Sequence, residues 1–122
     1  MSSDSYEYCP RCHARIPDDE CGEGTGVLIG HVRTFDAGVL ATDSKAAACK
    51  VLEEASEVRE AWSAYHDAAD AVSAAHARLK LADELADVVQ AACNLASSTG
   101  VDLRAALDRC EQRNRDRGRI TV

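Results

Sequence analysis

Two pairs of carboxylates at helical spacing are the residues of this chain best suited to carry chemistry. Glu54 and Glu57 form one pair, within an EExxE pattern that begins at Glu53, and Glu84 and Asp87 form the other. Residues three apart on an α-helix lie within about 60° of each other around its axis, so each pair can point to one side. Four carboxylates brought together repel one another unless protons or a cation neutralise them. Hard cations such as Mg²⁺ prefer oxygen ligands of this kind, so the pattern predicts a magnesium site.

The apolar residues around these acids predict two amphipathic helices that position them. In both segments apolar side chains recur at i, i+4, i+7, i+11 and i+14, the spacing of a helix with one buried face. The two stripes run over Val51–Tyr65 and Leu81–Leu95, and both the stripes and the acids repeat after thirty residues. Because each acid precedes a stripe residue by one position, we expect the acids at the edge of the buried seam. A single acidic face is usually only solvated, but a second pair in the same register favours the metal site.

Length and composition restrict the fold and the compartment. The 122 residues fit one domain with at most a small appendage, and the chain is 46% hydrophobic but only 4% aromatic. Such a thin, small-residue core predicts self-association to bury enough apolar surface. No run of 18 apolar residues exists, and the start Met1–Cys12 lacks the basic and apolar parts of a signal peptide. We therefore expect no membrane partner and a cytoplasmic protein with reduced thiols.

Charge is unevenly distributed along the chain. The net charge of −7 argues against a nucleic-acid partner. From Thr99 onward six arginines stand against four acids, so the tail is net positive and the rest is more acidic. An acidic centre with a basic tail suits a cation and a polyanion bound together. The alternative interpretation is that arginines near the end of a helix simply favour the helix dipole.

The N-terminal segment, residues 1–40, carries cysteines at metal-binding spacing. Cys9 and Cys12 form a Cys-x-x-Cys turn with a proline inside, and Cys21 follows eight residues later. A zinc knuckle uses two such thiolates on one Zn²⁺, and tetrahedral zinc needs four ligands. We predict a structural Zn²⁺ on these three cysteines, with His31 as the first choice of fourth ligand and His13 or Cys49 as alternatives. A redox pair and a degenerate site are the competing interpretations.

The remaining elements follow from start and stop signals. A short β-like run, Val27–Phe35, with a turn after it predicts a hairpin. The helical domain, residues 41–122, should begin its first helix after Asp43 or Ser44 and end it near Tyr65. The alanine-rich residues 66–80 should form a short helix or an extension, and Gly100 should end the second acid helix. A last helix is expected from about Asp102 to Gly118. The cysteines outside the knuckle should be small core residues: Cys49, Cys93 and Cys110.

At this point a family resemblance can be stated. EExxE followed by ExxD resembles the MazG-like all-α nucleoside triphosphate pyrophosphohydrolases, whose relatives include dimeric dUTPases and phosphoribosyl-ATP pyrophosphohydrolases. The segment Asn94–Ala96, the helix start Gly100–Leu103 and the ending Arg113–Gly118 are also similar to this group. The similarity covers roughly residues 45–119, and the cysteine-bearing segment departs from it.

The resemblance implies an all-α helical bundle completed as a homodimer or homotetramer. It implies a Mg²⁺-dependent hydrolase, with Mn²⁺ able to substitute, that cleaves a nucleoside triphosphate between its α- and β-phosphates to a monophosphate and pyrophosphate. Carried over residue by residue, the metal ligands would be Glu54, Glu57, Glu84 and Asp87. Glu53 would lie behind them or help to orient the attacking water, and Glu57 would share the catalytic role.

Candidate substrate contacts and a second function remain open. Developing phosphate charge needs nearby cations, and the candidates are Lys50, Lys80, Arg113 and Arg117. Asn94 could read a base or ribose or could be structural, and Trp62 could stack on a base but fits the core better. The alternative function is a non-enzymatic zinc-knuckle binding module on a helical scaffold. Net acidity and the four acids weigh against it.

Overall fold

The computed structural model describes residues 7–8, 15–16 and 26–121. Its helices are α1 (Lys45–His66), α2 (Ala71–Thr99) and α3 (Leu103–Asp116), with a short 3₁₀ helix, η2 (Val39–Ala41). Two short strands, β1 (Glu7–Tyr8) and β2 (Arg15–Ile16), pair antiparallel, with Glu7 opposite Ile16 and Tyr8 opposite Arg15. All larger elements are therefore helical, as the sequence predicts.

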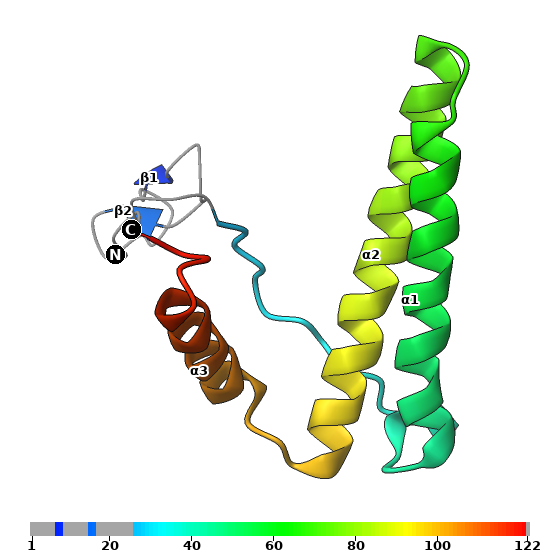
Figure 1. Ribbon diagram of the computed structural model, residues 1–122. Coiled ribbons are helices and arrows are strands. Elements are labelled where there is room, and N and C mark those ends of the chain that lie inside the picture. The colour runs from blue at the N-terminus through cyan, green and yellow to red at the C-terminus, as the bar shows by residue number, and fades with distance from the viewer. Residues whose placement is uncertain (1–6, 9–14, 17–25, 122) are drawn as a thin grey trace. The chain divides into compact units, whose positions relative to one another are not determined.

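The chain divides into two compact units. One unit, Val32–Leu103, contains α1 and α2, which lie side by side and antiparallel as a long hairpin (Figure 1). Helix α3 belongs to the other unit. None of the helices in the described part of the chain is long and apolar enough to cross a membrane.

Side-chain caps set the starts of both hairpin helices. Ser44 precedes α1, and its hydroxyl accepts a hydrogen bond of 3.2 Å from the amide of Ala47. Asp70 precedes α2, and its carboxylate accepts one of 2.7 Å from the amide of Ser73, which lowers the pKa of Asp70. Capping of this kind satisfies amides that have no partner inside the helix. The predicted start at Ser44 is confirmed, and residues 71–80 form the first part of α2 rather than a separate helix.

Gly100 ends α2 as predicted. Its φ of 71° is left-handed, and its amide donates to the carbonyl oxygen of Ser97 at 3.4 Å. Glycine adopts this conformation at little cost, which is why it commonly stops a helix.

The predicted strand over Val27–Phe35 is wrong, because residues 26–36 have no regular structure. This segment contacts α2 instead of a neighbouring strand. The amide of Phe35 donates to Oδ1 of Asn94 at 2.9 Å, and Nε2 of Gln90 donates to the carbonyl oxygen of Arg33 at 2.8 Å. Side chains of α2 thus supply the backbone partners that a strand would have needed.

The seam between α1 and α2 is built from small and polar residues. The buried residues of the hairpin lie seven apart on α1 and seven or three apart on α2: Ala47, Glu54 and Ala61 on α1, and Glu84, Ala91 and Asn94 on α2. Glu54 and Glu84 therefore lie in the seam itself and not at its edge, whereas Glu57 and Asp87 are exposed. Alanines at these positions allow the two helix backbones to approach closely.

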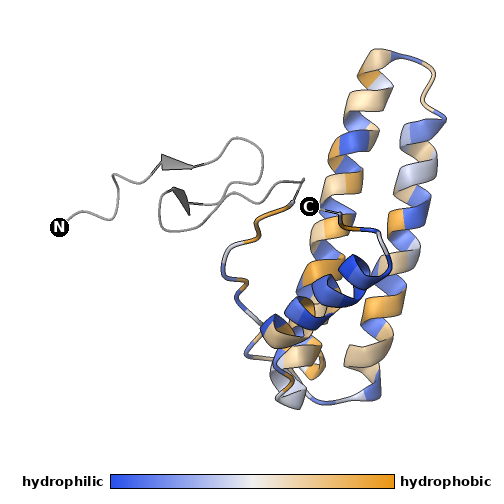
Figure 2. Ribbon diagram, turned by 60° about the vertical axis from the view of Figure 1, so that its left-hand side comes forward, coloured by the Kyte–Doolittle hydropathy of each residue, from blue (hydrophilic) through white to orange (hydrophobic). Residues whose placement is uncertain are grey.

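None of the ten apolar stripe residues expected in the core is fully buried: four are exposed and six are half-buried. Trp62 is 50% exposed and stacks on the ring of His66, with 5.0 Å between ring centroids, and Leu85 is also 50% exposed. Figure 2 shows apolar residues recurring along both helices of the hairpin. Cys49 is likewise exposed rather than in the core, and Cys93 and Cys110 are half-buried. One hairpin alone leaves these stripes without a cover.

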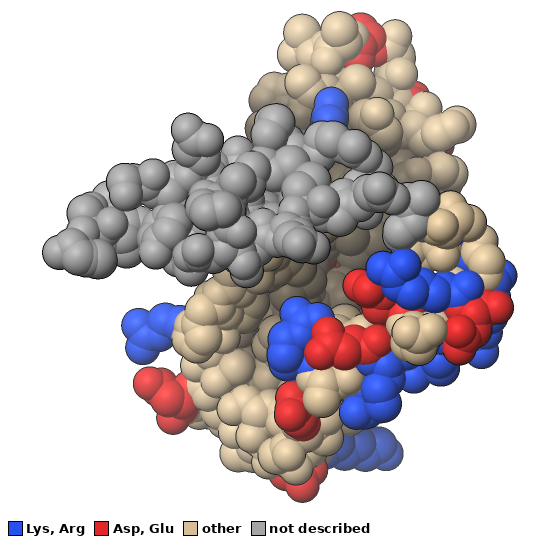
Figure 3. Space-filling view, turned by 90° about the vertical axis from the view of Figure 1, so that its left-hand side faces the viewer, with Lys and Arg blue, Asp and Glu red and all other residues tan. Residues whose placement is uncertain are grey.

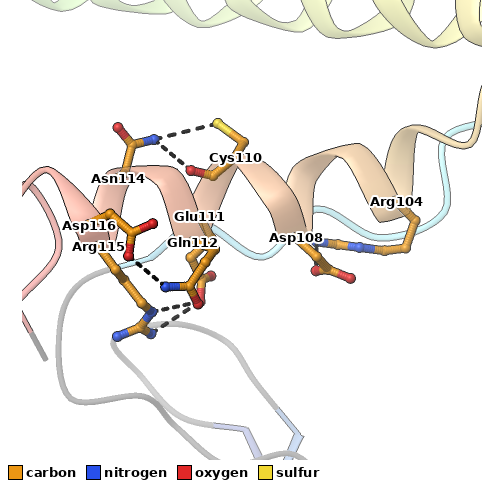
Figure 4. Close-up of polar contacts among 8 residues, drawn as sticks. All are labelled: Arg104, Asp108, Cys110, Glu111, Gln112, Asn114, Arg115 and Asp116. Carbon is orange, nitrogen blue, oxygen red and sulfur yellow. Dashed lines mark hydrogen bonds and ion pairs between the residues drawn. The ribbon is translucent and has the colours of Figure 1, made fainter.

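Helix α3 carries charged side chains of both signs, which Figure 3 shows gathered in blue and red. Several of them pair one turn apart along the helix (Figure 4): Arg104 with Asp108 at 3.0 Å and Arg115 with Glu111 at 3.1 Å. Such pairs support an exposed helix by a few tenths of a kcal/mol each, roughly 0.2–0.5. Part of the basic charge of this tail is therefore matched locally.

Candidate functional site

Three carboxylates converge where α1 and α2 pack. One oxygen from each of Glu54, Glu84 and Asp87 lies within 4.8 Å of the other two. Glu54 comes from α1 and the other two from α2, so the helix pairing brings them together. Glu54 and Glu84 are only 6% and 4% exposed, whereas Asp87 is exposed. Burying two carboxylates beside a third is unfavourable without compensating charge.

Two lysines supply part of that compensation. Nζ of Lys50 lies 2.9 Å from Oε1 of Glu54, and Nζ of Lys80 lies 2.7 Å from Oε1 of Glu84. Each lysine precedes its glutamate by four residues on the same helix. The hydrogen bond and the attraction of the carboxylate raise the pKa of both lysines, so they remain charged.

The second oxygen of each buried glutamate has no partner. Oε2 of Glu54 and Oε2 of Glu84 are buried without a hydrogen bond among the described residues. A buried carboxylate oxygen left unpaired is costly and needs an explanation, such as an ion. A divalent cation placed among these oxygens would satisfy both, so the residues present fit such an ion.

Glu57, the fourth predicted ligand, lies beside the cluster. It is exposed, and only when it carries a proton can it donate a hydrogen bond to Glu84. That bond, together with repulsion from Glu54 and Glu84, raises the pKa of Glu57. The pKa of Glu84 is lowered, first by its hydrogen bond with Lys80 and then by the one with Glu57. Without a cation, the raised pKa of Glu57 and the lowered pKa of Glu84 favour a proton on Glu57 rather than on Glu84.

The other predicted site residues are distributed more widely. Glu53 is exposed and lies 3.6 Å from Lys50. Asn94 is buried, and its Oδ1 accepts from Phe35 and from Gln90, so it holds the 33–35 segment. Arg113 lies on α3 and Arg117 follows it, both in the other unit. The predicted zinc ligands Cys9, Cys12 and Cys21 lie outside the described residues, as does His13, whereas His31 is described and exposed.

Two pockets flank the acid cluster, one on each side. The smaller, of about 170 Å³, is lined by Lys50, Glu54, Asp87, Gln90, Ala91 and Asn94, with Phe35 and Leu40 from the preceding segment. The larger, of about 350 Å³, is lined by Glu57, Glu60, Ala61, Ala64, Lys80 and Glu84. No motif or periodicity in the sequence singles out Gln90 or Phe35. Their roles follow from how residues 33–41 lie on α2, which no periodicity in the sequence indicates.

The model of the phosphoribosyl-ATP pyrophosphohydrolase family matches residues 33–114, about two thirds of the chain. The chain belongs to this family. It is thereby a member of the MazG-like all-α nucleotide pyrophosphohydrolase superfamily, which confirms the resemblance. No curated protein and no solved structure shows a significant match to the chain.

The family match covers the acidic cluster but not the cysteines. All five acids of the EExxE and ExxD patterns lie inside residues 33–114, as do Lys50 and Lys80. Cys9, Cys12, Cys21 and His31 lie before the matched region, and Arg117 lies after it. The phosphoribosyl-ATP pyrophosphohydrolase family is one of hydrolases that act on acid anhydrides and release pyrophosphate from a nucleotide. A zinc function for the N-terminal segment would therefore be an addition to the family's chemistry.

Proposed function

We propose that the protein is a Mg²⁺-dependent pyrophosphohydrolase that cleaves a nucleotide between its α- and β-phosphates. The products would be the corresponding monophosphate and pyrophosphate, and Mn²⁺ would substitute for Mg²⁺. The substrate would be a nucleoside triphosphate or a derivative of one, such as the phosphoribosyl-ATP that the family name gives.

One observation carries the proposal: two buried glutamates with unpaired oxygens lie beside an aspartate in the seam of the hairpin. Evolution of a purely structural seam would favour apolar residues at these positions, since buried charge seldom adds stability. Carboxylates that exist to hold a cation explain both the burial and the unpaired oxygens. Glu54, Glu84 and Asp87 would hold the ion, and Glu57 would join them once ionised.

Bound Mg²⁺ would neutralise phosphate charge and lower the pKa of a water molecule. The chain's own residues would do the rest. Glu57, which lines the same pocket as Glu84, would accept the proton of the attacking water as general base. Glu53 would orient that water, either directly or through its 3.6 Å contact with Lys50.

Basic and amide side chains would bind the nucleotide. Lys50 and Lys80 lie at the cluster, and Arg113 and Arg117 are the candidates from the C-terminal part. Any contact from Asn94 to a base or ribose would have to come from its amide nitrogen, because its Oδ1 already accepts two hydrogen bonds. We assign this activity to residues 41–122 and a separate zinc-binding role to residues 1–40.

Self-association completes the proposed enzyme. The hairpin buries only three apolar side chains, Ala47, Ala61 and Ala91, among the described residues. Its exposed large apolar side chains include Leu79 at 67% and Trp62 at 50% exposure. Because a protein commonly covers exposed apolar surface by association, we propose a homodimer or homotetramer.

Pyrophosphate release from a nucleotide panel tests the function. The panel holds phosphoribosyl-ATP, the common triphosphates and dUTP, each with Mg²⁺ and with EDTA. We expect release that needs Mg²⁺ and that differs among the substrates. A protein that binds zinc but releases no pyrophosphate from any of them would instead be the binding module on a helical scaffold.

A further inference from the structure

Around the acid cluster, helices α1 and α2 are related to each other by an approximate local two-fold symmetry. Adding thirty to a residue number on α1 gives its counterpart on α2, and this holds for the ion pairs as well as the acids. Lys50 with Glu54 matches Lys80 with Glu84, at 2.9 and 2.7 Å. The buried alanine Ala61 has the buried counterpart Ala91.

The two pockets obey the same relationship. Each of the six helical residues that line the smaller pocket has its counterpart, thirty residues away, in the larger one. In chain order the pairs are Lys50 and Lys80, Glu54 and Glu84, Glu57 and Asp87, Glu60 and Gln90, Ala61 and Ala91, and Ala64 and Asn94. The pockets are therefore two copies of one half-site, related by exchange of the helices.

The two half-sites differ in what covers them. Gln90 and Asn94 hold the 33–35 segment by hydrogen bonds of 2.8 and 2.9 Å, and Phe35 and Leu40 then line the smaller pocket. The counterparts of these two anchors are Glu60 and Ala64. Alanine has no side-chain group that could hold a backbone amide in the same way. Among the described residues, the 33–40 segment lines only the smaller pocket, which we call the closed half-site, whereas the larger pocket, which we call the open half-site, is lined by α1 and α2 alone.

We infer that the open half-site, which we define by Glu57, Glu60, Ala61, Ala64, Lys80 and Glu84, receives the phosphate chain of the substrate nucleotide, with Lys80 as its phosphate contact. The inference rests on the proposed function and deepens it. Its volume of about 350 Å³ lies within the range of small-molecule sites, roughly 300–1,000 Å³, whereas the closed half-site is too small. The Lys80 side chain is 68% exposed, against 37% for Lys50, so Lys80 can turn toward a ligand.

Charge in the open half-site sets a condition on binding. Three glutamates and one lysine line it, so a bare polyphosphate would be repelled. A nucleotide should enter only together with a cation that offsets those carboxylates. Ala61 and Ala64 form the uncharged part of the lining, and the small side chain of Ala64 leaves the room that asparagine occupies in the closed half-site.

Filling the open half-site is the decisive experiment. Ala64 is exposed on α1, so Ala64→Trp should fold while obstructing the pocket, and Ala64→Asn copies the closed half-site with a smaller change. The probe is α,β-methylene-ATP, which cannot be cleaved between those phosphates, with affinity measured by calorimetry in Mg²⁺. We expect Ala64→Trp to weaken binding of the probe by about tenfold or more. Mg²⁺ should still raise the melting temperature of this variant. The wild-type protein should bind no probe in EDTA.

Two controls isolate the effect. Ser56→Trp places the same bulk on an exposed position of α1 that lines neither pocket, and should bind the probe as wild type does. Lys80→Gln and Lys50→Gln each remove a lysine from a buried glutamate one turn away, so their effects on the metal should be alike. We expect Lys80→Gln to lose several-fold more probe affinity than Lys50→Gln.

Each other outcome overturns the inference. If Ala64→Trp binds the probe like wild type, the phosphate chain lies elsewhere, and the pyrophosphohydrolase proposal stands as long as wild type releases pyrophosphate. If Ala64→Trp keeps its affinity but sediments as a smaller species than wild type, a second copy of the chain occupies the half-site. If wild type neither binds the probe nor releases pyrophosphate, the proposed function fails first and the inference with it.

Discussion

Nζ of Lys80 lies 2.7 Å from one oxygen of Glu84, while the other oxygen of that carboxylate is buried without a hydrogen-bond partner among the described residues. The lysine therefore neutralises Glu84 only in part. The same division recurs at Lys50 and Glu54 on the facing helix. Two carboxylates that face each other across the seam, each with one unpaired oxygen, leave a place for a cation that the lysines do not fill.

Replacing Asp87 with Asn, or Glu57 with Gln, should abolish pyrophosphate release while leaving the fold intact. Each change keeps the size of the side chain and removes one negative charge from the cluster. Activity should fall about 100-fold or more, the scale of losing a metal ligand or its support. Melting in EDTA should be unchanged or higher, because repulsion among the acids is relieved.

Asp83→Asn is the control for these variants, because Asp83 is an exposed acid of α2 outside the cluster. Mg²⁺ should raise the melting temperature of wild type and of Asp83→Asn but not of Asp87→Asn, since an ion that binds only the folded state stabilises it. If the Asp87→Asn and Glu57→Gln variants release pyrophosphate at the wild-type rate and show the wild-type rise in melting temperature with Mg²⁺, the acids are only a solvated helix face and hold no ion.

The stability of the metal-free protein should depend on pH through Glu57. Its folded-state pKa is raised above the ordinary value of 4.5 by the hydrogen bond with Glu84 and by repulsion from Glu54 and Glu84. Ionising Glu57 is therefore harder in the folded than in the unfolded state, and stability is lost as pH rises from about 4.5 through the raised pKa. Glu57→Gln should be free of this loss.

The measurement is the difference in free energy of unfolding between wild type and Glu57→Gln in EDTA. We expect the variant to gain on wild type as pH rises through this window, and the gain to level off above it. A difference that stays flat with pH would mean that Glu57 does not share the proton of the cluster.

The acid motif, the start of α1 and the end of α2 could be predicted from the sequence because they depend on local rules. Ser44 and Gly100 are a cap and a stop whose effect needs only neighbouring residues. The thirty-residue register of the acids is also visible in the chain. These features predict the all-α fold and the family resemblance.

The buried face of each helix could not be predicted in the same way. Periodicity identifies the apolar stripe, and Trp62 and Leu85 follow it, yet both are half exposed in the hairpin. The helices instead pack along alanines and the two glutamates, because small residues permit a close approach and the acids are held there for their charge. Likewise, Val27–Phe35 has a strand-like composition, but its backbone bonds to side chains of α2. Contacts between segments distant in the sequence determine both the buried face of each helix and the irregular structure of Val27–Phe35.

Self-association should depend on the exposed stripe. Sedimentation at micromolar concentration should give a dimer or a tetramer, and Trp62→Ala should shift the distribution toward smaller species because half of this ring lies open on one hairpin. Arg59→Ala, at an exposed polar position on the same helix, should sediment as wild type does. A well-folded wild-type monomer at these concentrations would contradict the proposal.

The N-terminal cysteines should bind zinc independently of the hairpin. Protein purified in metal-free buffers should carry about one Zn²⁺ per chain, the content of a structural site. Changing both Cys9 and Cys12 to Ser should remove the zinc and leave most of the helix content, because the hairpin begins only after Ser44. Zinc content that survives the double change would show that these thiolates are not its ligands.

Asn94→Ala should release the segment that closes the smaller pocket. Asn94 is 4% exposed, and its Oδ1 accepts from the amide of Phe35 at 2.9 Å and from Nε2 of Gln90 at 3.0 Å. Alanine leaves both donors without this acceptor, at a cost of about 1–3 kcal/mol in the free energy of unfolding. Urea denaturation measures that cost, and hydrogen exchange at the Phe35 amide should accelerate by more than global destabilisation explains.

Thr34→Ala is the matched control for that loss. The Thr34 hydroxyl makes an exposed contact of 3.4 Å with the Ser97 hydroxyl, in the same segment and against the same helix. A long, solvent-exposed hydrogen bond contributes little, so this variant should stay within about 0.5 kcal/mol of wild type. If Asn94→Ala and Thr34→Ala behaved alike, the segment would be held by the packing of Phe35 and Leu40 rather than by Asn94. The difference between the half-sites would then depend on those two apolar side chains, which have no counterparts in the open one.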